Sequence, residues 1–260
     1  MMLQSDIEQA AEWVMNARRI LFITGAGISA DSGLPTYRGI GGLYEDKQTE
    51  HGIPIEVALS GDMMSTRPDI TWKYLRQIEQ SCRGAAFNQA HQVIADIEQL
   101  KPESWVLTQN IDGFHRSAGS KNVIEIHGQV GELVCTRCLQ RQAVEDYSHI
   151  EGLPVCERCH NILRPNVVLF GEMLPEQAVM DLHREMVGGF DLVFSIGTTS
   201  VFPYISQPVY EARKWGAKVI EINPGITEVS PFVNVRLQMR AAHAMRQIGQ
   251  AMGLSPKNTH

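Results

Sequence analysis

Residues 22–39 read FITGAGISADSGLPTYRG, an apolar stretch that runs into three closely spaced glycines. Within it, GAGISA (25–30) fits the G-x-G-x-x-G/A pattern that joins a buried strand to a helix at dinucleotide sites. The first glycine permits a tight turn, the second lets the backbone approach a pyrophosphate, and the last small residue packs the helix on the sheet. N–H groups at the start of the helix favour the anion. The stretch therefore predicts a bound nucleotide, with a purely structural use of the glycines as the alternative.

The sequence after this loop does not continue as it does in NAD-dependent dehydrogenases. Those proteins follow the loop with a helix, a second strand and an acidic residue about 20 positions on. Residues 40–66 contain several glycines, one proline and no strand pattern instead. The chain also lacks the G-x-x-x-x-G-K-[ST] motif of P-loop nucleotidases. We expect the nucleotide to be held in an arrangement that neither class uses.

Short apolar runs alternate with helical patterns along the rest of the chain. The strand patterns cover 19–24, 104–109, 123–128, 191–197 and 217–223. The helical patterns cover 3–17, 67–80, 87–100, 176–187, 206–214 and 238–252. Apolar strands separated by amphipathic helices indicate an α/β fold with a parallel, doubly wound sheet. Residues 40–66 and 131–164 break this alternation, so we predict that both are insertions forming a second, discontinuous domain.

Composition narrows the classes of partner and the location. The 260 residues carry a net charge of −6 and no cluster of Lys or Arg, which argues against a nucleic-acid ligand. No apolar stretch approaches the roughly 20 residues of a membrane helix, so no membrane partner is expected. The N-terminus has acidic residues and no signal-type cleavage region, which favours a first helix. We expect a cytoplasmic protein whose five cysteines are reduced unless they hold a metal.

Four of the five cysteines follow a metal-binding pattern. CTRC (135–138) and CERC (156–159) give two C-x2-C pairs separated by seventeen residues. This spacing is typical of a four-thiolate zinc site, and four thiolates leave no open position for water or substrate. We therefore predict structural Zn²⁺ bound by Cys135, Cys138, Cys156 and Cys159, with two redox pairs as the alternative. The nearby His149 and His160 are interpreted as surface residues, and Cys82 as a semi-buried structural thiol near a helix end.

Polar residues follow several of the predicted strands. Because an open parallel sheet binds its ligand at the carboxyl edge, these side chains can read a dinucleotide there. A histidine in this position is a natural general base, since its ordinary pKa is about 6.5. Turn formation or helix capping is the alternative for any single one of them. The residues are Gln109, Asn110, Asp112, His115, His127, Thr198, Thr199, Ser200 and Asn223. His91 is different, because it lies on a helical stripe and is interpreted as a satisfied core histidine.

Taken together, these blocks resemble a known family. GAGISADSGLPTYRG, TQNIDGFH, EIHG, the paired CxxC motifs, RPNVVLFGE (164–172), IGTTS and EIN occur in the order and spacing of sirtuins, the NAD-dependent protein lysine deacylases. The resemblance runs from about residue 18 to 250. It implies a Rossmann-type domain built from 1–39, 84–130 and 165–260. It also implies a smaller zinc-binding and helical domain built from 40–83 and 131–164.

The resemblance also implies how NAD is used. NAD is consumed as a co-substrate: nicotinamide leaves, the acyl oxygen takes the ribose anomeric carbon, and the products are free lysine, nicotinamide and O-acyl-ADP-ribose. His127 would be the catalytic base, acting on a ribose hydroxyl after nicotinamide has left. Asn110 and Asp112 would bind the nicotinamide carboxamide and turn it toward departure. The other residues implied at the NAD site are Gly25, Ala26, Gly27, Thr36, Tyr37, Arg38, Gln109, Gly197, Thr198, Thr199 and Asn223.

A second set of residues is implied for the acyl-lysine protein or peptide. The Val168 carbonyl would accept the acyl-lysine N–H, and Phe170 would line the acyl tunnel. Gly171 and Glu172 would pair with the peptide as an added strand.

The chain departs from the common sirtuin pattern at a few positions. Thr36 and Tyr37 replace Asp and Phe, and Tyr204 stands where alanine is usual. Desuccinylase-type members use a Tyr-x-x-Arg pair, but this chain has Tyr74-x-x-Gln77, or Lys73-x-x-Arg76 in the shifted register. Acetyl or another neutral acyl group is therefore expected, although Lys73 or Arg76 could supply a cation. ADP-ribosyl transfer or NAD hydrolysis on the same fold, and a non-enzymatic sensor, are the competing hypotheses.

Overall fold

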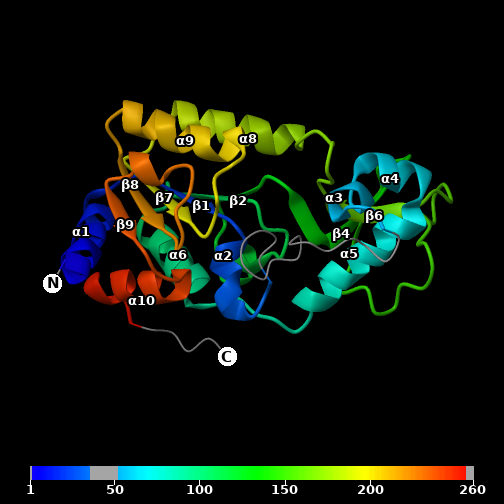
Figure 1. The fold of residues 1–260 in the computed structure, drawn as a ribbon, viewed down its shortest axis with the longest axis horizontal. Helices are drawn as coiled ribbons and strands as arrows, with labels where there is room; N and C mark the ends of the chain where they lie inside the picture. The colour runs from blue at the N-terminus through cyan, green and yellow to red at the C-terminus, as the bar shows by residue number, and fades with distance from the viewer. Residues whose placement is uncertain (1, 36–51, 256–260) are drawn as a thin grey trace.

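The computed structural model describes residues 2–35 and 52–255. The larger of its two sheets is parallel and has six strands, and Figure 1 shows it flanked by helices. The strand order is β3-β2-β1-β7-β8-β9, and every pairing is parallel. Successive strands run outward from β1 on one side and from β7 on the other, which confirms the predicted doubly wound α/β fold. The bounds are β1 Ile20–Thr24, β2 Trp105–Thr108, β3 Val123–Glu125, β7 Leu192–Ile196, β8 Lys218–Ile222 and β9 Val235–Leu237.

Helices cover both faces of this sheet. α8 (Glu176–Val187) and α9 (Pro203–Lys214) lie on one face; α1 (Met2–Asn16), α6 (Gln89–Leu100) and α10 (Ala241–Ala251) contribute to the core on the other (Figure 1). Alternate residues of each buried strand enter the two cores: Phe22 belongs to the first and Leu21 to the second. All five predicted strands and all six predicted helices are present, with ends shifted by up to three residues. β9 was missed, because three residues carry too little periodicity to register.

A second, antiparallel sheet lies in the part of the chain that breaks the alternation. Its order is β5-β4-β6, with β4 Gly128–Cys135, β5 Arg141–Ala143 and β6 Leu163–Val167. The helices α3 (Ile55–Ala58), α4 (Gly61–Thr66) and α5 (Pro68–Cys82) pack with it in a third core around Trp72. The Trp72 indole is fully buried and donates its N–H to the Leu163 carbonyl at 3.0 Å. The proposed domain boundaries stay a prediction.

The chain passes from one sheet to the other at Gly128. The pattern at 123–128 predicted one strand, but β3 ends at Glu125 and β4 begins at Gly128 in the other sheet. Gly128 has φ +75°, and a Cβ there would stand 1.9 Å from the Asn166 carbonyl oxygen, so only glycine fits this crossing. His127 therefore lies at the junction between the two sheets.

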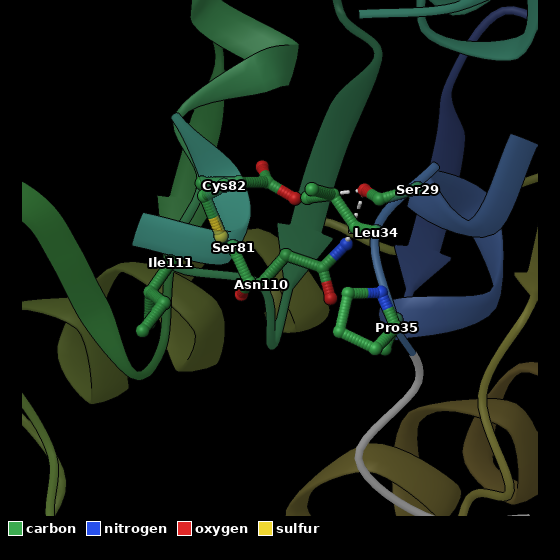
Figure 2. A pocket seen from close by; sticks show the side chains of 9 residues that line it. Ser29, Leu34, Pro35, Ser81, Cys82, Asn110 and Ile111 are labelled. Carbon is green, nitrogen blue, oxygen red and sulfur yellow. Dashed lines mark hydrogen bonds between the residues drawn. The ribbon is translucent and has the colours of Figure 1, made fainter. Parts of the chain in front are cut away.

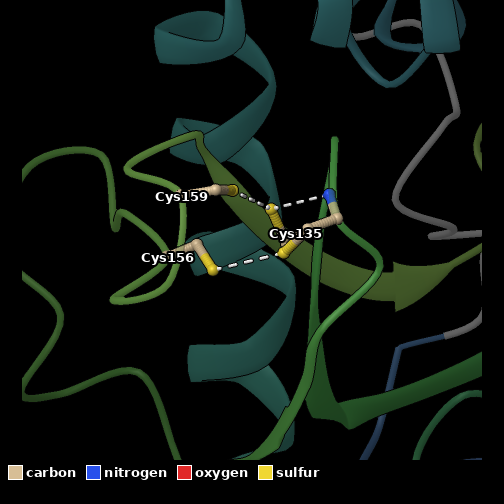
Figure 3. A group of neighbouring side chains, drawn as sticks. Cys135, Cys156 and Cys159 are labelled. Carbon is tan, nitrogen blue, oxygen red and sulfur yellow. Dashed lines mark hydrogen bonds between the residues drawn. The ribbon is translucent and has the colours of Figure 1, made fainter.

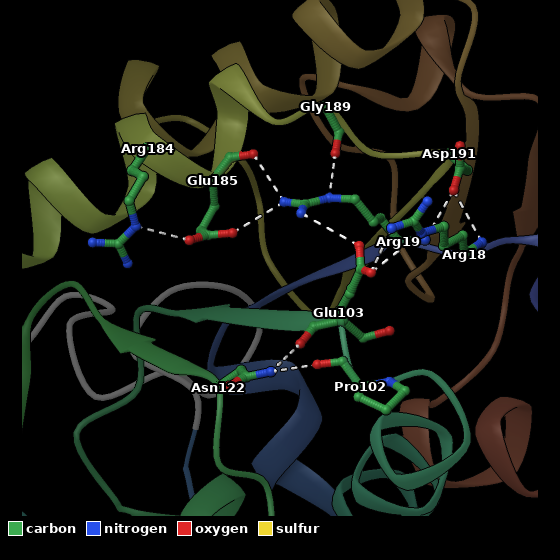
Figure 4. A network of polar contacts seen from close by, with 10 residues as sticks. Arg18, Arg19, Pro102, Glu103, Asn122, Arg184, Glu185, Gly189 and Asp191 are labelled. Atoms are coloured by element: carbon green, nitrogen blue, oxygen red, sulfur yellow. Dashed lines mark hydrogen bonds and ion pairs between the residues drawn. The ribbon is translucent and has the colours of Figure 1, made fainter.

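A network of polar contacts joins the amino ends of β1 and β7, at the edge opposite the crossing (Figure 4). The backbone N–H groups of Arg18 and Arg19 donate to the Asp191 carboxylate at 2.9 and 2.8 Å. The Arg19 guanidinium pairs with Glu185 at 3.0 Å and donates to the Gly189 carbonyl at 2.8 Å. These bonds connect the start of β7 to the start of β1. They lie at the amino edge of the sheet, whereas a ligand of an open parallel sheet binds at the carboxyl edge.

The remaining elements are short. α2 (Ala26–Ser29) and the 3-10 turn η1 (Ala30–Ser32) follow β1; α7 (Phe114–Ser117) follows β2; and the 3-10 turn η2 (Ser230–Phe232) precedes β9. Over 2–35 and 52–255, none of the helices combines the length and apolar character needed to cross a membrane.

Candidate active site

The carboxyl edge of the six-stranded sheet lines a cleft of about 880 Å³ that also reaches the second sheet. It gathers most residues of the predicted NAD and peptide sites: Gly25, Ala26, Gly27, Gln109, Asn110, His127, Val168, Phe170, Gly171, Glu172, Gly197, Thr198, Thr199 and Asn223. Asp112 lines an adjoining cavity of about 20 Å³ that shares Ala26 and Asn110 with the cleft (Figure 2). The predicted residues Thr36, Tyr37 and Arg38 lie outside the described residues.

The glycine loop packs tightly against the turn after β7. The Gly25 N–H donates to the Ile196 carbonyl at 3.1 Å, and the Gly27 N–H donates to the Gly197 carbonyl at 2.8 Å. A Cβ on Gly27 would stand 2.6 Å from the Gly197 Cα, so the two turns require glycine for their own contact. α2 is a single turn rather than the helix that was expected to attract the pyrophosphate. Pyrophosphate binding by these two N–H groups would compete with the bonds they already make.

Asn110 and Asp112 are held by one serine at the small cavity. The Ser29 hydroxyl donates to Asp112 Oδ2 at 2.7 Å and accepts from Asn110 Nδ2 at 3.2 Å. Figure 2 shows Ser29 and Asn110 at this cavity. The Phe114 N–H donates to Asp112 Oδ1 at 3.0 Å, and Asn110 Nδ2 also donates to the Gly25 carbonyl at 3.1 Å. Burial raises the pKa of the Asp112 carboxyl, and the Phe114 and Ser29 hydrogen bonds oppose that rise. The arrangement presents a desolvated carboxyl group beside an amide that is fixed in orientation.

Three strand ends are linked through their side chains across the floor of the cleft. Gln109 after β2 donates its Nε2 to Thr198 Oγ1 at 2.8 Å. Asn223 after β8 donates its Nδ2 to the Thr198 carbonyl at 3.0 Å and accepts the Gly225 N–H at 3.0 Å. The predicted nucleotide-binding side chains therefore support one another, which holds their positions before a ligand binds.

Both ring nitrogens of His127 have defined partners. Nδ1 lies 2.9 Å from the Gln109 carbonyl oxygen, which only accepts, so Nδ1 carries the proton and Nε2 is an acceptor. Tyr204, on the first turn of α9, donates its hydroxyl to Nε2 at 2.8 Å. Burial lowers the pKa of His127, and the Gln109 carbonyl opposes that effect. The imidazole is thus neutral at pH 7 with its basic nitrogen in the cleft.

Tyr204 is a site residue to which sequence reasoning gave no role. The available signals were its replacement of the usual alanine and its position in FPY, just after the polar GTTS segment. Its ring stacks on Phe202 at 5.4 Å, and the edge of His127 contacts both rings.

The predicted peptide-binding segment is anchored to both neighbouring elements. The Val168 N–H donates to the His127 carbonyl at 2.9 Å, and the Phe170 N–H donates to the Leu59 carbonyl at 3.0 Å. Glu172 closes a turn, because its N–H donates to the Leu169 carbonyl at 3.1 Å and its carboxylate pairs with Arg164. Gly171 has φ +81° in this turn. Pairing of this segment with a peptide as an added strand stays a prediction.

His115 differs from its expected place, and His91 differs only in its hydrogen bonds. His115 was expected at the polar edge, but α7 turns it inward, where it is buried and its Nε2 lies 2.9 Å from Thr24 Oγ1. His91 is a core residue as predicted, but it is not fully satisfied. Its Nδ1 accepts the Asn88 N–H at 3.2 Å, while its Nε2 has no partner among the described residues. The rings of His91 and His115 lie 4.9 Å apart.

The four cysteines of the two C-x2-C pairs meet as predicted (Figure 3). Their sulfur atoms all lie within 4.8 Å of one another, and the Cys135–Cys159 and Cys138–Cys156 Sγ distances are 3.4 and 3.6 Å. A tetrahedral zinc with Zn–S of about 2.3 Å places its sulfurs about 3.8 Å apart, so the donor set fits a structural Zn²⁺. His149 and His160 are exposed as predicted. Cys82 is partly buried at the end of α5, and it also lines the cavity beside Asp112.

Comparisons with known proteins agree on one family. A model of the Sir2 family matches residues 25–203. The NAD-dependent protein deacylase 2 of Pseudomonas aeruginosa is 49% identical over 247 residues, covering 94% of this chain and 96% of that protein. Its namesake in Pseudomonas syringae pv. tomato is 51% identical over 247 residues, covering 92% of this chain and 98% of that protein.

Solved structures give the same result. A Sir2 homolog in complex with NAD matches with a TM-score of 0.84 at 33% identity, covering 95% of this chain and 94% of that one. A Sir2 structure with a deacetylated p53 peptide and 3'-O-acetyl ADP-ribose matches with a TM-score of 0.85 at 28% identity, covering 96% and 99%.

Proposed function

The chain belongs to the Sir2 family, and from this premise we propose that it is an NAD-dependent protein lysine deacylase. The observation that supports this most is a neutral His127, with its Nε2 as acceptor, in the same cleft as Asn110 and the glycine loop. NAD is the co-substrate, and the acyl group passes from lysine to ADP-ribose as nicotinamide is released. The four-thiolate site is structural and takes no part in this chemistry.

The first step is the departure of nicotinamide, which builds positive charge on the ribose. Asn110 and Asp112 lie together beside the small cavity, and the partly buried Asp112 carboxylate favours that charge because water screens it little there. The acyl oxygen then bonds to the anomeric carbon that nicotinamide has left. In the next step a ribose hydroxyl attacks the acyl carbon, and one water is consumed as lysine leaves as the free amine. His127 takes the proton of that hydroxyl, and its Nδ1–H bond to Gln109 keeps the ring in the required tautomer.

Replacing Asp112 by asparagine should slow nicotinamide release from NAD by about 10²-fold, because the variant lacks the charge that stabilises the developing cation. Asparagine keeps the size of the side chain and an oxygen for the Phe114 N–H, while its amide nitrogen takes the place of Oδ2, where the Ser29 hydroxyl must accept instead of donate. Nicotinamide formation by the purified protein, with NAD and an acetyl-lysine peptide, measures the effect. Asp62→Asn, the same change on an exposed side chain of α4, is the control. Unchanged release by Asp112→Asn would refute the role assigned to Asp112.

We infer that the preferred acyl group is neutral, with acetyl as the expected substrate. Where the cleft meets the third core it is lined by apolar side chains: Leu59, Ile78, Ile111, Leu169 and Phe170. The two cations considered from the sequence have other partners. Arg76 donates to the Gly152 carbonyl and lies over the Trp72 ring, and Lys73 lies over the Tyr74 ring. Neither lines the cleft as described, so an acyl carboxylate gains no counter-charge from them.

The proposed function is tested by nicotinamide release from NAD with and without an acetyl-lysine peptide, with the products identified by mass spectrometry. Release that needs the peptide and yields O-acetyl-ADP-ribose is the expected result. A succinyl-lysine peptide of the same sequence is the matched arm, and it should react more slowly. Peptide-independent release would favour NAD hydrolysis or ADP-ribosyl transfer, and no release with any acyl peptide would favour a sensor. We also propose a cytoplasmic location, supported by thiols that must stay reduced to bind zinc.

A further inference from the structure

We propose that Tyr204 relays the proton from the ribose hydroxyl to His127, so that the base never contacts its substrate directly. This inference rests on the proposed deacylase function and on one contact, the hydrogen bond from the Tyr204 hydroxyl to His127 Nε2 at 2.8 Å. It adds a residue to the reaction that neither the glycine loop nor the polar strand ends supply.

The tautomer of His127 means that the Tyr204 contact occupies the only ring nitrogen that can accept a proton. With Nδ1 donating to the Gln109 carbonyl, Nε2 holds the one lone pair that can accept a proton. Tyr204 occupies that lone pair, so a ribose hydroxyl cannot donate to Nε2 while the tyrosine stays in place. A phenol oxygen carries two acceptor lone pairs besides its O–H donor. It can therefore accept from the ribose hydroxyl while it donates to Nε2.

The position of Tyr204 is fixed by packing. Pro203 and Tyr204 open α9, with Phe202 as the residue before the helix. The Phe202 and Tyr204 rings are stacked with an interplanar angle of 12°, and the His127 ring meets them edge-on at 88° and 82°. All three residues line the cleft. The stacking restricts the Tyr204 side chain, so its hydroxyl stays between the His127 imidazole and the cleft.

The proton transfer itself needs no other reactant, while the complete reaction also consumes one water, whose oxygen replaces the lysine nitrogen on the acyl carbon. The ribose O–H bond breaks as its oxygen forms the new bond to the acyl carbon, and its proton goes to the Tyr204 oxygen. The Tyr204 O–H bond breaks in the same event, and that proton forms the N–H bond of His127 Nε2. Tyr204 is neutral before and after, and His127 becomes an imidazolium that can return the proton to the departing lysine amine.

A relay and a purely structural tyrosine predict opposite orders for two variants. Tyr204→Phe keeps the ring stacked on Phe202 and near-perpendicular to His127 but removes the hydroxyl, so the ring still stands in front of Nε2 and no relay remains. Tyr204→Ala loses the packing but opens a path for the ribose hydroxyl or a water to reach Nε2. If the ring served only for packing, alanine would be the more harmful change, because it removes the contact with Phe202.

The relay also predicts a change in pH dependence. A hydrogen bond donated to the neutral Nε2 favours the neutral imidazole, so loss of the Tyr204 hydroxyl should raise the pKa of His127. The acid limb of kcat/KM should then move up by about 0.5–1 pH unit in Tyr204→Phe. Among the described residues, the other charged groups that line the cleft are Glu172, which pairs with Arg164, and Arg240, which pairs with Asp31. Both pairs are unchanged in the variant, so they do not contribute to the shift.

The experiment measures O-acetyl-ADP-ribose formation and nicotinamide exchange for wild type, Tyr204→Phe and Tyr204→Ala from pH 5 to 9. Tyr210→Phe, the same change at an exposed position of α9, is the control. We expect Tyr204→Phe to form product about 10²-fold more slowly, to keep nicotinamide exchange within a few fold, and to be slower than Tyr204→Ala. Product formation by Tyr204→Phe at the wild-type rate, or a slower Tyr204→Ala, overturns the relay alone. A wild-type protein that forms no product overturns the proposed function, and the relay with it.

Discussion

Replacing His127 by alanine should reduce deacylation by about 10²–10⁴-fold, the usual contribution of a positioned general base. Nicotinamide should still leave, because Asn110 and Asp112 are bound to Ser29 and not to His127. The expected signature is therefore nicotinamide exchange that continues while O-acetyl-ADP-ribose no longer accumulates. Both are measured in one reaction with labelled nicotinamide and an acetyl-lysine peptide.

The pH dependence of the wild-type protein supports the same assignment. His127 must be neutral to accept a proton, and burial lowers its pKa from 6.5. The midpoint of the acid limb of the rate should therefore lie below pH 6.5. His183→Ala, on an exposed position of α8, controls for the loss of a histidine elsewhere. A stable His127→Ala protein with near-normal product formation would remove His127 from the mechanism.

Replacing Cys135 by serine should release the metal and unfold the second sheet. Cys135 is fully buried in the third core, and its sulfur accepts the N–H groups of Arg137 and Cys138 at 3.4 and 3.5 Å. Structural zinc in small sites contributes an apparent binding free energy of about 10–16 kcal/mol, which is as large as the whole stability of a typical domain. Loss of one zinc ligand should therefore unfold the antiparallel sheet.

Zinc content and hydrogen exchange measure the two parts of this prediction. Metal analysis should find about one zinc per chain in the wild type and much less in Cys135→Ser. Amides of β4, β5 and β6 should lose protection, while those of β1 and β7 keep it. Cys82→Ser is the matched control, since Cys82 lies outside the sulfur cluster. Full zinc content together with unchanged melting of the variant would contradict a structural zinc site.

Elements with strong local signals could be predicted from the sequence. Strands such as β1 and β7 are buried at every position, and helices such as α8 have a clear amphipathic period. Each of these elements can therefore be predicted from its own residues alone. The C-x2-C pairs are equally local, because zinc ligation requires that spacing. The antiparallel sheet was missed, since β5 is fully exposed and only Leu133 and Cys135 of the eight residues of β4 are buried.

Contacts between distant residues could not be predicted in this way. His127 and Tyr204 are 77 positions apart, and nothing in either segment indicates the other. His115 shows the same limit in reverse. Its place after a strand predicted the cleft, but the turn of α7 points it at Thr24 instead.

The sequence by itself thus determined the parallel fold, the metal ligands and the residues at the sheet edge, because these follow from local periodicity and spacing. Only the tertiary structure decided which of those residues face the cleft and which are used within the protein. The Gly25 and Gly27 amides are bonded to the β7 turn, and the His127 lone pair is bonded to Tyr204. The reason is physical: a buried polar group takes whichever partner the packed chain brings near, and packing joins segments that are remote in sequence.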